Sequence, residues 1–131
     1  MKSIVIISPD WRFRALLRAQ LLEEGFGVRA GNCVADLPEL TNGHSADPDL
    51  LVADLGGFAG AENEENDLMQ CARRSPLWIV APAEHPGANA LAARLRAVAE
   101  QVFSRPLDLG EFVECIKKRL MPVENEHVEH P

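Results

Sequence analysis

The chain has 131 residues, of which 47% are hydrophobic and 25% charged, as in an ordinary globular protein of one domain. Its formal net charge of −7 argues against binding to nucleic acid, because a phosphate backbone requires clustered cations. No apolar run approaches the roughly 20 residues that span a bilayer, so no membrane partner is expected. Three widely spaced cysteines without a CxxC pair (Cys33, Cys71 and Cys115) indicate reduced thiols and a cytoplasmic protein.

Short apolar runs alternate with longer amphipathic segments along the chain. After the first apolar run, apolar residues recur at helical spacing at Phe13, Leu16, Leu17 and Leu21. Gly25 should end that helix, because glycine accepts the left-handed conformation common at helix ends. The pattern predicts strands at residues 4–7, 26–30, 50–53, 77–80 and 102–103, and helices at residues 11–24, 34–41, 67–74, 88–98 and 109–120.

Two segments are predicted to lie outside these elements. Residues 55–66 are rich in glycine and acidic side chains, and we expect a loop there whose charges are solvated rather than bound to a metal. Residues 122–131 contain three glutamates and two histidines and are expected to form a flexible C-terminal tail. The folded domain is therefore predicted to span residues 1–121.

Five strand–helix units with apolar strands imply a parallel sheet that is covered by helices on both faces. Right-handed crossovers favour a flavodoxin-like, doubly wound (βα)5 fold of the α/β class with strand order 2-1-3-4-5. In this order the first and third strands are neighbours, so residues 8–10 should meet Asp54 at the carboxyl edge of the sheet. Ala81 and Arg105 should flank them. Ligand binding and chemistry in open α/β sheets take place at this edge.

A family resemblance rests on two features of the sequence: Asp54 at the end of a buried strand, and the dipeptide Arg105-Pro106 after the last predicted strand. From Lys2 to about Leu120 the sequence resembles the receiver domains of bacterial two-component response regulators, in these positions and in the lengths of its elements. The resemblance implies that Asp54 is the phosphoacceptor and that the Arg105-Pro106 bond is cis. It also implies a histidine kinase, a phosphotransferase or a downstream output protein as the partner.

At most other positions the sequence departs from the family pattern, and in this it resembles the atypical or pseudo-receiver subset. The family's acidic pair aligns with Ser8-Pro9, and Asp10 lies one residue beyond. Its hydroxyl after the fourth strand aligns with Ala81, and its aromatic residue in the fifth strand aligns with Val102. The resemblance therefore implies that the usual switch between hydroxyl and aromatic ring is missing.

The chemistry of the site depends on Asp10, Asp54 and Arg105. Active members of the family hold Mg²⁺, for which Asp10 and Asp54 are the candidate ligands here, since Mg²⁺ takes oxygen ligands. Asp10 is alternatively an N-cap of the first helix. Arg105 replaces the family's lysine, and its planar guanidinium is suited to hold a carboxylate. We expect an Arg105–Asp54 ion pair that fixes the site without metal or phosphate; alternatively, Arg105 points to solvent and Asp54 caps a turn.

The first helix presents an aromatic and basic face made of Trp11, Arg12, Arg14 and Arg18. Tryptophan and arginine are typical of interface hot spots. The resemblance implies that kinases or phosphotransferases dock on this helix. In the alternative interpretation, Trp11 packs beneath the first loop.

Three functions remain open. In the first, the chain is a stand-alone receiver-like signalling domain that acts through protein–protein contacts, with phosphorylation at Asp54 impaired or absent. In the second, it is a working phosphoacceptor that uses Asp54 and Mg²⁺. In the third, it is an unrelated flavodoxin-like module that binds a small anion. The missing acidic pair and hydroxyl favour the first. The resemblance also implies a homodimer through the fourth and fifth helices. An enzyme is not expected, because no nucleophile–base pair or cofactor motif can be identified.

Overall fold

The computed structural model describes residues 1–41, 47–57, 62–82 and 86–121. Their strands form one parallel sheet in the order β2-β1-β3-β4-β5, which is the flavodoxin-like order expected from the sequence. The strands are β1 (Ser3–Ile7), β2 (Gly27–Gly31), β3 (Leu50–Asp54), β4 (Leu77–Ala81) and β5 (Gln101–Ser104). The helices are α1 (Trp11–Glu23), α2 (Leu37–Thr41), α3 (Glu62–Ala72), α4 (Pro86–Leu95) and α5 (Leu109–Leu120), with 3-10 turns η1 (Val34–Asp36) and η2 (Leu55–Gly57).

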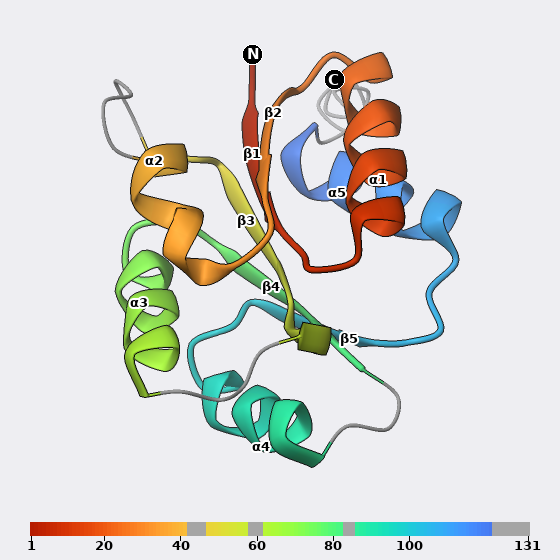
Figure 1. Cartoon of the computed structure of the whole chain (residues 1–131). Helices are drawn as coiled ribbons and strands as arrows, with labels where there is room; N and C mark the ends of the chain where they lie inside the picture. Colours follow the sequence, from red (N-terminus) through yellow and green to blue (C-terminus); the bar gives the residue numbers. More distant parts are fainter. Residues whose placement is uncertain (42–46, 58–61, 83–85, 122–131) are drawn as a thin grey trace, which may run out of the picture.

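Helices cover both faces of the sheet (Figure 1). Successive side chains of a strand point to opposite faces, so each central strand contributes to two apolar clusters. In β3, Leu51 belongs to the cluster beneath α2, α3 and α4, whereas Val52 belongs to the cluster beneath α1 and α5. Both side chains are almost fully buried. Burial on both faces is the reason why the apolar runs show no alternation with polar residues.

Helix α3 begins at Glu62, five residues before the predicted start at Asp67, so the prediction of a loop over residues 55–66 was wrong for its last part. Carboxylates are stabilised near a helix N-terminus by the helix dipole, and an acidic run is therefore compatible with a first helical turn. One of these carboxylates is not freely solvated: Glu65 Oε1 lies 2.7 Å from Arg94 Nε and links α3 to α4.

Other boundaries shift by a few residues. Helix α4 spans Pro86–Leu95 instead of residues 88–98, which agrees with the preference of proline for the first helical position. Its predicted last turn is replaced by a tight turn in which the N–H groups of Val98 and Ala99 both donate to Leu95 O. The single helix predicted at residues 34–41 is divided into η1 and α2.

Three further expectations concern the predicted tail and loop, the absence of a membrane span, and the cysteines. The predicted tail at residues 122–131 and residues 58–61 of the predicted loop lie outside the described residues. Within the described ranges, no helix has the length and apolar character needed to cross a bilayer. Cys33, Cys71 and Cys115 are free thiols.

Candidate functional site

Asp54 ends β3 at the carboxyl edge of the sheet, and its side chain is only 1% exposed. Its Oδ2 accepts hydrogen bonds from Ser8 Oγ and from Arg105 Nη2, both at 2.7 Å. Its Oδ1 accepts from the N–H of Gly56 at 3.1 Å. Burying a carboxylate is costly unless its oxygens are hydrogen-bonded, and here three donors from separate parts of the chain meet that requirement.

Arg105 reaches Asp54 from the segment that follows β5. Its guanidinium carbon lies 4.7 Å from the centroid of the Phe13 ring, and its Nη2 is 3.8 Å from Asp10 Oδ2. The Arg105-Pro106 bond is cis, as the resemblance implied. The arginine is thus held by two carboxylates and an aromatic face, and the alternative in which it points to solvent does not describe the structure. Sequence reasoning did not identify Phe13 as part of the site.

The loop between β1 and α1 supplies both the helix cap and a donor to Asp54. Asp10 Oδ1 accepts from the N–H groups of Arg12 and Phe13, at 3.1 and 3.2 Å, so Asp10 caps α1. Ser8 is fully buried, and its Oγ also accepts from the N–H of Asp10 at 3.1 Å. Sequence reasoning placed residues 8–10 next to Asp54 but did not single out Ser8. The available signal was a hydroxyl that directly follows four buried apolar residues.

The residues at this edge do not fit Mg²⁺ as they are arranged. Mg²⁺ requires near-octahedral oxygen ligands at about 2.1 Å. Ser8 and Pro9 offer no side-chain carboxylate, Asp10 Oδ1 caps a helix, and both oxygens of Asp54 accept hydrogen bonds from protein donors. Arg105 supplies the positive charge next to Asp54. Over the part of the chain that the structure describes, no group of three or more His, Cys, Asp or Glu side chains is placed to hold a metal ion.

The two switch positions, Ala81 and Val102, face the same apolar cluster, which is the one beneath α2, α3 and α4. Ala81 is buried there, and Val102 packs against the cluster from β5. Phe103 lies on the opposite face, with its ring centroid 5.2 Å from that of Trp78 and 4.9 Å from that of Phe112. Neither Ala81 nor Val102 has a polar side-chain group. The nearby aromatic ring is packed into the other cluster, away from both positions.

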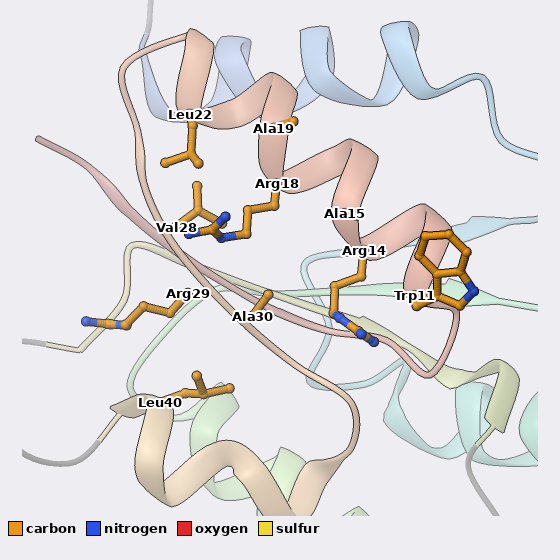
Figure 2. A pocket seen from close by; sticks show the side chains of 10 residues that line it. All are labelled: Trp11, Arg14, Ala15, Arg18, Ala19, Leu22, Val28, Arg29, Ala30 and Leu40. Carbon is orange, nitrogen blue, oxygen red and sulfur yellow. The ribbon is translucent and has the colours of Figure 1, made fainter.

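The residues proposed as a partner surface do not all share one face of α1. Trp11 is 67% exposed, so it does not pack beneath the first loop. Trp11, Arg14 and Arg18 line a groove beside β2, which Figure 2 shows from close by. Arg14 Nη1 also donates to the backbone oxygen of Ser8 at 2.6 Å. Arg12 lies outside the groove lining, with its guanidinium carbon 5.8 Å from the centroid of the Trp11 ring.

The last turn of α5 carries basic side chains that are largely bound within the chain. Lys117 Nζ lies 3.2 Å from both Glu24 Oε1 and Glu114 Oε2. Arg119 donates to both carboxylate oxygens of Glu100, at 2.6 and 2.9 Å. These bonds engage basic side chains of α5 within the chain, and the homodimer through the fourth and fifth helices stays a prediction.

No family model matches the sequence, and a search of the curated proteins finds no match. Solved structures, in contrast, include many with the same fold. The chain is similar to the non-phosphorylated HemR receiver domain from Leptospira biflexa, at 17% identity and a TM-score of 0.72 over 94% of this chain and 97% of that one.

Two further structures give the same result. A CheY-like response regulator receiver domain protein from Methanospirillum hungatei matches at 19% identity and a TM-score of 0.71, over 96% of this chain and 98% of that one. The chemotaxis response regulator CheY4 of Vibrio cholerae matches at 13% identity and a TM-score of 0.67, over 92% and 99%. Because these identities are low, the likeness concerns the fold. The chain therefore has the fold of response regulator receiver domains.

Proposed function

We propose that the protein is a stand-alone receiver-like signalling domain of a two-component system or phosphorelay. It acts in the cytoplasm through protein–protein contacts rather than as an enzyme, and phosphorylation of Asp54 is impaired or absent. The observation that carries the proposal is the partly buried contact of 2.7 Å between Asp54 Oδ2 and Arg105 Nη2. The receiver-domain fold supports the signalling role.

Phosphorylation of Asp54 would require one of its oxygens to attack a phosphoryl donor in line, with cations that compensate the charge. The more heavily bonded oxygen, Oδ2, accepts from both Ser8 and Arg105. Attack through Oδ2 would therefore displace at least one of these hydrogen bonds, whereas Oδ1 accepts a hydrogen bond from the N–H of Gly56. Neither Ser8 nor Pro9 has a carboxylate to bind a second cation beside the attacking oxygen.

Acetyl phosphate labelling tests the proposal directly. Wild-type protein and the Asp54→Asn variant are incubated with Mg²⁺ and acetyl phosphate, and the intact mass of each is measured. We expect no phosphoryl adduct on either protein. An adduct on wild type that is absent from Asp54→Asn would refute the proposal and favour a working phosphoacceptor.

A combined Ser8→Asp, Pro9→Asp and Arg105→Lys variant is the matched positive control. It provides an acidic pair where the family has one and replaces the guanidinium next to Asp54 by a compact ammonium group. If this variant folds and is labelled while wild type is not, the natural side chains are the cause of the block. Beryllofluoride with Mg²⁺ gives an independent measurement, because a ligand that binds the folded state raises Tm. We expect no rise in Tm for wild type.

The proposed partners are a histidine kinase, a phosphotransferase or a downstream output protein. We also propose that α4 and α5 form a homodimer face. Sedimentation velocity at a series of protein concentrations checks the dimer. A single monomeric species over the whole range would contradict it.

A further inference from the structure

A groove of about 670 Å³ runs beside β2; Asp54, Ser8 and Arg105 are not among its lining residues, although Arg14 of the lining donates to the backbone oxygen of Ser8. One wall is the face of α1 that carries Trp11, Arg14, Arg18 and Leu22, which recur every three or four residues. The floor is β2, and Leu40 of α2 contributes the other side (Figure 2). Two of the large side chains that line the groove, Trp11 and Leu22, are exposed by 67% and 42%. The groove therefore offers apolar surface to a partner.

The floor of the groove is the open edge of the sheet. In the described residues β2 pairs with β1 and with no strand on its other side. The N–H of Gly27 donates to Lys2 O at 2.9 Å, so Gly27 faces β1. Because the backbone groups of successive residues in a strand point to opposite sides, Val28 and Ala30 direct their N–H and C=O groups outward. An edge of this kind is a template for an added strand.

The charge of the groove indicates what it would bind. Arg14, Arg18 and Arg29 line it, and the described residues of the lining include no acidic side chain, although the whole chain carries a net charge of −7. Two nitrogens of Arg29, Nε and Nη2, are buried and have no hydrogen-bond partner among the described residues, so their charge would attract an acidic occupant of the groove without direct contact. A second copy of the chain paired through the same edge would bring arginines against arginines. An acidic occupant would neutralise them.

We propose that this groove binds an extended acidic segment of a partner protein, which adds to the sheet as a further strand beside β2. Backbone hydrogen bonds to Val28 and Ala30 provide the pairing, and side chains provide the selectivity. Acidic side chains of the segment lie against the arginines, and its apolar side chains lie against Trp11 and Leu22. The proposal goes beyond the signalling role above and does not depend on it, since neither Asp54 nor Arg105 lines the groove.

The probe is a fluorescently labelled eight-residue peptide of alternating glutamate and valine, and its counterpart alternates lysine and valine. Binding to the full chain is followed by fluorescence anisotropy, and amide hydrogen exchange of Val28 and Ala30 is followed by NMR. We expect the glutamate peptide to bind and to slow exchange at both amides, and the lysine peptide to do neither. No binding of the glutamate peptide, or binding that leaves both amides unprotected, would overturn the proposal.

Two variants locate the binding. Ala30→Pro removes one outward N–H, and proline is tolerated on an edge strand where that group faces solvent. Arg18→Gln removes an exposed charge from the groove. We expect each to weaken peptide binding about tenfold, which corresponds to about 1.4 kcal/mol.

Arg12→Gln is the matched control, because Arg12 is an exposed arginine of α1 outside the groove lining. Its affinity for the glutamate peptide should equal that of wild type. Equal affinities for Arg18→Gln, Arg12→Gln and wild type would contradict the assigned groove even if Ala30→Pro failed to fold. Asp54→Asn should bind the peptide as wild type does, so failure here and failure in the phosphorylation assay are separate results.

Discussion

At the residue scale, the contact between Arg105 and Asp54 dominates the carboxyl edge of the sheet. The carboxylate is 1% exposed and the arginine side chain 28% exposed, so water screens the pair only in part. Phe13 lies against the guanidinium and Ser8 donates to the same carboxylate oxygen. Removing either charge leaves the other in an environment built for a pair, which is costly when the remaining charge is buried.

A double-mutant cycle measures this coupling. Arg105→Met leaves the buried carboxylate of Asp54 without its cation, and we expect it to lower the free energy of unfolding by about 2–3 kcal/mol. In the Asp54→Asn background the same change should cost much less, with a coupling energy of about 1–2 kcal/mol. Urea unfolding of wild type, both single variants and the double variant gives these values. Additive effects would show that the two side chains do not interact in solution.

At the element scale, the end of α1 depends on the backbone of one residue. Gly25 has a φ of +94°, a backbone conformation that residues with a Cβ rarely adopt. Its N–H donates to Leu22 O. A Cβ built at this position has no atom within 4 Å, so a substitution would meet no steric obstacle.

Gly25→Ala therefore isolates the conformational cost of ending α1. We expect it to lower the free energy of unfolding by about 1 kcal/mol, and Gly25→Asn to lower it by less, because asparagine tolerates left-handed backbone better than alanine. Thermal or urea unfolding checks both values. A stabilised Gly25→Ala protein would show that the position does not hold a positive φ.

Glu100, which directly precedes β5, links this strand to β4 and α5 through hydrogen bonds with Trp78 and Arg119. Hydrogen bonds from Arg119 lower the pKa of Glu100, helped by a bond from Trp78 Nε1 and opposed by desolvation. A glutamate whose pKa is lowered by folding stabilises the protein above its unfolded pKa of about 4.3. This contribution is lost as the pH falls through the lower pKa of the folded state.

We expect Glu100→Gln to remove this part of the pH dependence, since glutamine still accepts a hydrogen bond from Trp78 but does not ionise. The free energy of unfolding of wild type should fall more steeply than that of Glu100→Gln between about pH 5 and pH 3. Urea unfolding of both proteins across this interval gives the two slopes. Parallel slopes would mean that Glu100 has the same pKa in the folded and unfolded chains.

At the scale of the whole molecule, the sheet separates two apolar clusters. Adjacent residues of β1 face different clusters: Ile6 packs beneath α1 and α5, and Ile7 packs beneath α2, α3 and α4. Both are fully buried. Losses of packing on the two faces should therefore be independent.

Ile6→Val and Ile7→Val test this separation. Each removes one buried methylene-sized group and should lower the free energy of unfolding by about 1 kcal/mol. The double variant should show the sum within about 0.5 kcal/mol, because the two side chains share no cluster. Urea denaturation measures all three. A clearly larger or smaller loss in the double variant would indicate that the clusters are coupled through the sheet.

The periodicity of the chain was enough to predict the architecture. Apolar runs of strand length, the amphipathic spacing around Leu17 and the glycine at position 25 are local signals, and the handedness of crossovers then leaves few topologies. The topology in turn brings residues 8–10, Asp54 and Arg105 to one edge. The start of α3 was predicted wrongly, because an acidic run is a signal for both a solvated loop and the first turn of a helix.

Only packing in three dimensions decided which groups touch. Ser8 and Asp54 are 46 residues apart in the chain and Asp54 and Arg105 are 51 apart, so each hydrogen bond depends on the placement of whole elements to within a fraction of an ångström. The Phe13 ring against Arg105 and the groove beside β2 have the same origin. Periodicity determines which face a residue occupies, but contact between distant segments depends on how all the side chains between them fill space.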